Sequence, residues 1–300
     1  MNLYQQRSSN IRRTWALIFG FLVVVIAVGY AISYYYGNPF ILYIAVFIAV
    51  ATNFYAYWQS DKLVLSMNHA RLASREEFFD FYTVTENLVI TAGLPKPKLY
   101  VIDDPAPNAF ATGRDEKHAV VCATTGLLAI LTRSELEGVI AHELSHIKNR
   151  DILLMTIAVV LAGFVAIVAD IFLRTSLHGG GRGGDNGKAN MLFLVLAIVG
   201  IILAPIAAKL IQFAVSRRRE YLADASGALL TRYPEGLASA LEKISSHNMP
   251  MHHANHATAH LFIDEPFGKP EGGKLAWLER LFSTHPPVSD RIKVLLNQQS

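Results

Sequence analysis

Long apolar stretches alternate with stretches of mixed polarity along this chain. No charged side chain occurs between Arg13 and Asp61, and only the tripeptide Gly-Asn-Pro at 37–39 interrupts the apolar run. It leaves two spans, 15–36 and 39–58, each close to the roughly 20 residues that cross the hydrocarbon core of a bilayer. The pattern therefore predicts a hairpin of two transmembrane helices. A cleaved signal peptide is the alternative for the first span, but the apolar part is longer than such peptides have.

A second apolar pair follows at 152–173 and 191–215. The segment that joins these two spans, 174–190, is rich in glycine and predicts a flexible linker. The pattern indicates a second transmembrane hairpin, and hence four transmembrane helices in all. Asp170 and Lys209 lie within the spans, so a buried helical hairpin of a soluble domain is the alternative.

Basic residues indicate how the chain is oriented. Arg7, Arg12 and Arg13 precede the first span, whereas the turn of the first hairpin is uncharged. Because cytoplasmic flanks are enriched in Lys and Arg, we expect the N-terminus and the segments 59–151 and 216–300 to be cytoplasmic. The linker of the second hairpin is net positive, which runs against this rule.

The polar segments predict a small α+β domain in two parts. Short strands are expected at 98–102 and 118–124, and a capping box between Thr132 and Glu135 opens a helix. The helices expected in the two parts are 132–151, 217–233, one from Pro234 and one from 286. The predicted division is the first hairpin at 1–58, the first catalytic part at 59–151, the second hairpin at 152–215 and the second catalytic part at 216–300.

Composition supports a membrane protein and narrows the chemistry. Of 300 residues, 52% are hydrophobic and 17% charged, and the mean hydropathy of +0.30 is unusual for a soluble protein. The single cysteine, Cys122, excludes an intrachain disulfide and a cysteine-rich zinc site, so a metal would need His and carboxylate ligands. The net charge of +3 is too small to indicate a nucleic-acid partner.

The segment before the second apolar pair carries a metal-binding pattern. His142, Glu143 and His146 form the motif His-Glu-x-x-His. On a helix, residues i and i+4 share one face, so both imidazoles can bind one Zn²⁺. Glu143 lies about 100° around the helix from His142 and can act as general base toward a water at that ion. A chance match to this short motif is the alternative, and the apolar positions around it argue against chance.

A third ligand is expected from the segment after the second hairpin. Glu220 is the best candidate, and Asp224, one helical turn later, can orient a ligand histidine through its free ring N–H. Because a hairpin returns both ends to one side of a membrane, His146 and Glu220 can meet despite their separation in sequence. The alternative is a solvated helix face that pairs with the neighbouring arginines.

Two further segments are candidates for substrate binding. The sequence Asn-Ala-Phe-Ala-Thr-Gly at 108–113 predicts either an exposed edge strand that pairs with an extended peptide or an ordinary hairpin segment. His285 and Arg291 can stabilise an oxyanion or grip a peptide group. A histidine cluster at 252–260 has metal-compatible spacing, but it lacks an apolar face and is typical of a mobile loop.

Taken together, these motifs resemble the HtpX family of membrane-bound zinc endopeptidases, within peptidase family M48 and related to the Ste24-type CAAX proteases. The resemblance covers nearly the whole chain, because both apolar pairs and four motif segments occur in the family's order. Those segments are 108–113, 141–151, 217–227 and 283–292. Several motifs in a fixed order are far more specific than the His-Glu-x-x-His motif alone.

The resemblance implies a set of site residues. One Zn²⁺ per chain would be held by His142, His146 and Glu220, with Glu143 as the catalytic base and Asp224 supporting the ligands. Substrate backbone would pair with Asn108, Ala109, Phe110 and Ala111, while His285 and Arg291 would lie on the substrate side of the site.

The fold expected is a mainly α membrane protein with four transmembrane helices and a cytoplasmic, gluzincin-like α+β protease domain carrying a small β-sheet. The resemblance implies cleavage of misfolded or damaged membrane proteins at the cytoplasmic face of the bacterial plasma membrane, with protein substrates and the lipid bilayer as partners. Two alternatives stay open. One is a CAAX-type prenyl-protein protease, and the other is a non-catalytic zinc-responsive sensor or scaffold, which leaves Glu143 unexplained.

Overall fold

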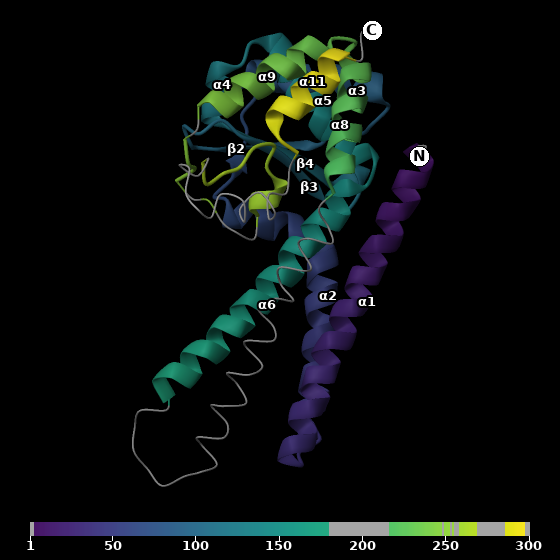
Figure 1. Cartoon of the computed structure of the whole chain (residues 1–300), viewed down its shortest axis with the longest axis vertical. Helices are drawn as coiled ribbons and strands as arrows, with labels where there is room; N and C mark the ends of the chain where they lie inside the picture. The colour runs from purple at the N-terminus through teal and green to yellow at the C-terminus, as the bar shows by residue number, and fades with distance from the viewer. Residues whose placement is uncertain are drawn as a thin grey trace.

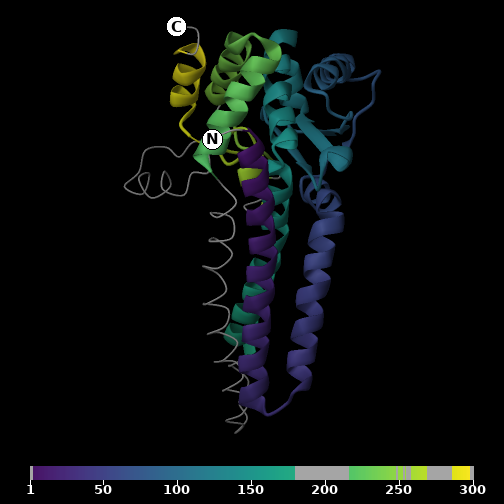
Figure 2. The ribbon, with the colours of Figure 1, turned by 90° about the vertical axis from the view of Figure 1, so that its right-hand side faces the viewer.

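Three long helices extend from one side of a domain that contains a small sheet (Figure 1). They are α1 (Leu3–Tyr36), α2 (Phe40–Met67) and α6 (Asp151–Gly179). The computed structural model describes residues 3–179, 216–247, 249–252, 254, 258–268 and 286–297. Figure 2 shows α1 and α2 side by side along their length, joined by the turn at Gly37, whose backbone is in the left-handed conformation (φ 62°).

These helices are longer than the apolar spans that predict them. By length and composition, Arg7–Tyr36, Phe40–Met67 and Asp151–Val168 could each cross a membrane. The first two are mostly exposed, with 22% and 17% of their apolar windows buried, as lipid-facing helices require. In the third, 72% is buried, so the start of α6 packs inside the protein. The predicted fourth span, 191–215, lies outside the described residues.

The start of α6 is buried because it packs between α1 and α2. Phe21 of α1 meets Phe164 of α6 edge to face, with ring centroids 5.8 Å apart, and Leu17 belongs to the same cluster. Farther along α6, Asp170 pairs with Arg174 at 2.7 Å, which compensates the acidic residue within this apolar helix. The helix continues to Gly179, so the predicted linker starts later than 174.

A four-stranded mixed sheet lies in the domain. Its order is β1 (Arg71–Leu72), β2 (Lys98–Ile102), β4 (Ala119–Thr124) and β3 (Ala109–Gly113). β2 and β4 are parallel, and the other two pairs are antiparallel. Both predicted strands are confirmed, and the 108–113 segment forms the edge strand. Alternate residues of the sheet pack on the side of α5 or on the side of α2 and α6.

Short helices complete the domain around α5 (Arg133–Lys148). They are α3 (Phe79–Ala92), α4 (Thr125–Ile130), α8 (Arg217–Thr231), α9 (Pro234–Ser246), α11 (Val288–Asn297) and the 3₁₀ turns η1 (Glu116–His118) and η2 (Ala259–Leu261). The predicted capping box is present at the start of α5. Its Glu135 carboxylate also accepts hydrogen bonds from Ser239 (2.6 Å) and Lys243 (2.7 Å), which fastens α5 to α9.

The metal-motif helix does not run directly into the apolar helix. The prediction of one helix over 132–151 is wrong at its end, because α5 stops at Lys148 and α6 begins at Asp151. Arg150 between them has a left-handed backbone (φ 60°), which a continuous helix cannot contain. The break changes the chain direction and leaves Asp151 at the first turn of α6.

Candidate metal centre and active site

Close packing of α8 on α5 brings the candidate ligands together. Gly227 of α8 faces the backbone of α5, and a Cβ added there would lie 3.0 Å from the backbone nitrogen of His142. Glycine therefore allows the two helices to approach more closely than any larger residue would. Two turns earlier on α8, the same approach places Glu220 opposite the two motif histidines.

His142, His146 and Glu220 form a buried cluster. The Nε2 atoms of the two imidazoles are 3.2 Å apart. One Glu220 carboxylate oxygen lies 3.6 Å from His146 Nε2, and the other lies 3.8 Å from His142 Nε2. Each side chain is at most 8% exposed, and their ligand atoms all lie within 4.8 Å of one another. Among the described residues, this group is the candidate metal site.

Carboxylates on the far side of each imidazole show that the cluster fits a cation. Asp224 Oδ1 lies 2.9 Å from His142 Nδ1, and Asp151 Oδ2 lies 3.0 Å from His146 Nδ1. The His146 contact has hydrogen-bond geometry, whereas the His142 contact is an ion pair only. Both carboxylates favour a proton on Nδ1, which leaves each Nε2 lone pair for the cluster. Two lone pairs and a carboxylate that converge in a buried space need a positive charge between them. Two histidines and a glutamate match a catalytic zinc site.

Asp151 is a site residue that the sequence analysis missed. It is fully buried, and besides His146 it contacts Arg219 Nε at 3.3 Å and receives a hydrogen bond from Asn10. Its position at the head of an apolar helix is that of an ordinary helix-start aspartate. No signal in the sequence separates it from such an aspartate, because its contact with His146 depends on the break at Arg150.

The electrostatics of the cluster favour a bound cation and a basic carboxylate. Burial lowers the pKa of His146, but the hydrogen bond to Asp151 and the charges of Glu220 and Glu143 reverse this and raise it to about 9. Burial raises the pKa of Glu143 above that of a free glutamate. Glu143 is 2% exposed and lies on the same helix as both histidines. A carboxylate in this environment accepts a proton more readily than one in water.

Arg291 lies behind the cluster. Its guanidinium is fully buried and donates two hydrogen bonds to Asp224, at 2.9 Å and 2.7 Å, and one to the Ile263 carbonyl at 3.2 Å. Burial opposes ionisation of Asp224, yet the charge of Arg291 lowers the pKa of that carboxyl to about 2. In this structure Arg291 binds the carboxylate that lies 2.9 Å from His142 Nδ1, and its predicted contact with a substrate peptide stays a prediction.

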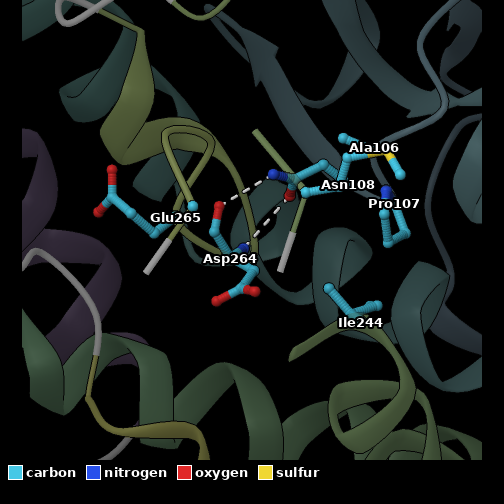
Figure 3. Close-up of a pocket in the computed structure, with 8 residues that line it drawn as sticks. Ala106, Pro107, Asn108, Ile244, Asp264 and Glu265 are labelled. Atoms are coloured by element: carbon cyan, nitrogen blue, oxygen red, sulfur yellow. Dashed lines mark hydrogen bonds between the residues drawn. The ribbon is translucent and has the colours of Figure 1, made fainter. Parts of the chain in front are cut away.

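The edge strand β3 is buried, so the expectation of an exposed strand is wrong. The chain's own residues 263 and 264 cover its first part. The Ile263 N–H donates to the Ala109 carbonyl at 2.9 Å. The Asn108 amide pairs with both backbone groups of Asp264, at 2.9 Å and 3.2 Å (Figure 3). Asn108 also lines a small pocket with Ile244 of α9, and it is not free to bind substrate in this arrangement.

The structure also describes Phe110 and Ala111, the other two residues of β3 that were expected to contact substrate. The Phe110 side chain packs edge to face on Phe262, with centroids 5.0 Å apart. Asn108 pairs with β4 through the Thr124 N–H, so the backbone groups of Ala111 point away from β4, as alternate residues of an antiparallel strand do. His285 lies outside the described residues.

The histidine cluster does not form a helical metal site over its described part. His252 is exposed, and its backbone N–H donates to Asp104 at 2.7 Å. His260 is buried in η2, while His256 lies outside the described residues.

Three comparisons with known proteins agree with a protease. The model of the family described as Peptidase family M48 matches residues 77–299 of this chain. A protein named Protease HtpX homolog from Caldanaerobacter subterraneus is 48% identical over 298 residues, covering 98% of this chain and 97% of its own. One of the same name from Pyrococcus furiosus is 48% identical over 282 residues, covering 93% of each chain. The crystal structure of S. mikatae Ste24p is similar with a TM-score of 0.50 at 18% identity, covering 97% of this chain and 67% of that one.

Proposed function

Because this chain belongs to peptidase family M48, as an HtpX-type membrane metalloprotease, we propose that it is a zinc-dependent endopeptidase acting at His142, His146 and Glu220. The observation that carries the proposal is the convergence of two Nε2 lone pairs and one carboxylate in a buried space. A zinc ion held there supplies Lewis acidity for peptide hydrolysis.

We propose the following roles for the chain's own residues. Glu143 takes a proton from the attacking water and returns it to the leaving nitrogen, since burial raises its pKa. Asp224 and Asp151 hold the two ligand imidazoles in the required tautomer. We assign oxyanion stabilisation to His285, on the family resemblance alone.

An extended substrate segment is proposed to pair with the edge of β3 at Ala111, the part that residues 263 and 264 do not bond to, once the groups that bury this strand move aside. Asn108 and Ala109, which were expected to share this role, already bond to residues 263 and 264. Backbone pairing reads little of a substrate's side-chain sequence, which suits an enzyme that cleaves many unfolded chains.

The substrates proposed are misfolded or damaged membrane proteins, cut at the cytoplasmic face of a bacterial plasma membrane. The support is positional, because Asp151 belongs both to the metal centre and to the first turn of the apolar helix α6. A substrate segment that emerges from the bilayer beside α6 is therefore close to the site.

Cytoplasmic orientation can be tested by cysteine labelling, because the native Cys122 is buried and gives no background. Lys117 on η1 and Asn38 in the α1–α2 turn are both exposed. In intact spheroplasts, a membrane-impermeant maleimide should label Asn38→Cys, and should label Lys117→Cys only after permeabilisation. The reverse pattern would place the catalytic domain outside.

Metal removal tests the proposed activity itself. Detergent-purified protein should contain about one zinc per chain, lose casein cleavage on chelation and regain it when about one equivalent of zinc is added. Zinc binding without cleavage of casein or a farnesylated peptide would favour the sensor alternative. Cleavage of the farnesylated peptide alone would favour the CAAX-type protease.

A further inference from the structure

The first long helix reaches the metal centre. Residues 3–14 of α1, here called the N-terminal overhang, precede its apolar span and lie beside the catalytic domain (Figures 1 and 2). Asn10 in this overhang is 1% exposed. Its Nδ2 donates one hydrogen bond to the Asn149 carbonyl at 3.0 Å and another to Asp151 Oδ1. Asp151 Oδ2 in turn bonds to His146 Nδ1.

We propose that Asn10 is a positioning residue for the metal centre. The proposal rests on the proposed function, because it concerns the site at His142, His146 and Glu220. Asn10 bridges the end of α5 and the start of α6, since its two amide hydrogens go to residues on either side of the break at Arg150. It fixes the direction of the Asp151 carboxylate and, through it, the His146 imidazole.

The N-terminal overhang contacts the catalytic domain at the surface through Arg7 and in the interior through Asn10. Arg7 pairs with Glu116 at 3.1 Å, but the Arg7 side chain is 43% exposed, and such surface pairs contribute little to stability. Asp151 is fully buried; it bonds to Asn10 and His146 and forms an ion pair with Arg219. Loss of one donor to a buried carboxylate matters more than loss of a surface ion pair.

Zinc affinity is the direct readout of this role. Loss of a partner that bonds directly to a metal ligand typically lowers metal affinity about 10- to 100-fold. Asn10 bonds to Asp151 rather than to a ligand, so we expect the lower end of this range, about tenfold, for Asn10→Ala. The zinc dissociation constant is measured by competition with a chromophoric chelator, using the full chain in detergent. The visible spectrum of the cobalt-substituted protein should shift as well, while KM for casein at saturating zinc should stay within about twofold, because Asn10 is far along the chain from β3 and makes no bond to it.

Two further variants separate hydrogen bonding from packing. Asn10→Asp keeps the size of the side chain but replaces the donor with a second carboxylate against Asp151, so it should bind zinc at least as weakly as Asn10→Ala. If packing alone mattered, Asn10→Asp would resemble the wild type. The matched control is Asn53→Ala, because Asn53 is a buried asparagine of α2 whose side chain, among the described residues, bonds within its own helix to the Ala49 carbonyl.

The outcomes are distinct. Weak zinc binding in both Asn10 variants with a wild-type result for Asn53→Ala supports the proposal. Equal affinity in the wild type, both Asn10 variants and the control overturns the positioning role and leaves the protease proposal intact. A wild type that holds no zinc overturns both, whatever the variants do.

Discussion

Glu143→Gln should lower casein cleavage about 10²- to 10⁴-fold or more while leaving zinc bound. Glutamine has the same shape but cannot accept the proton of the attacking water. Glu143 is on the same helix as both histidines, yet it is not in the ligand cluster of His142, His146 and Glu220. Metal content should therefore be unchanged. This result would show that cleavage is lost because the proton acceptor is missing and not because zinc no longer binds.

The measurement is initial cleavage rate together with zinc content, for protein purified with chelator and reloaded. Glu137→Gln is the matched control, because Glu137 lies on the same helix, is 38% exposed and pairs only loosely with Arg133 at 3.7 Å. It should cleave as the wild type does. Retained cleavage by Glu143→Gln would remove this residue from the mechanism.

Arg291→Met should lower the free energy of unfolding by about 3–5 kcal/mol, because it leaves the Asp224 carboxylate buried without its guanidinium partner. Asp224 is 1% exposed, and both of its oxygens accept from Arg291. The Arg291→Met, Asp224→Asn double variant removes the stranded charge and should recover part of that loss in stability, although His142 then faces a neutral amide in place of a carboxylate.

Urea unfolding in detergent, followed by tryptophan fluorescence, measures the effect. Arg133→Met is a suitable control, since Arg133 pairs with Asp80 at the surface and should contribute less than about 1 kcal/mol. The pH dependence has a defined sign. The pKa of Asp224 is about 2 in the folded chain against an ordinary 3.8, so its contribution is complete above about pH 4 and is lost as pH falls toward 2. An Arg291→Met protein as stable as the control would contradict this account.

Sequence patterns predict the parts of the site that are local. The i and i+4 spacing of His142 and His146, and of Glu220 and Asp224, needs only a helix to be informative, and both helices form. The return of the chain to the same place follows from the alternation of apolar spans. The helical spacing is a property of short segments, so it can be predicted without knowing the tertiary packing.

The parts that escape prediction depend on long-range contacts. Asn10 meets Asp151 across 141 positions, and Asn108 meets Asp264 across 156. Neither pair leaves a periodic signal in the sequence. The break at Arg150 is equally hidden, because arginine rarely adopts a left-handed backbone and surrounding contacts impose that conformation.

The place of Arg291 along the chain also orders events during biosynthesis. α11, which carries it, follows α1, α2, α6 and α8, and Asp224 has no guanidinium partner until α11 docks. Domains fold as the chain emerges, earlier segments first. His142 and His146 of α5 are thus synthesised long before Arg291, which binds the Asp224 carboxylate beside His142. The metal centre therefore gains the full support of Asp224 only after the C-terminal segment has been synthesised.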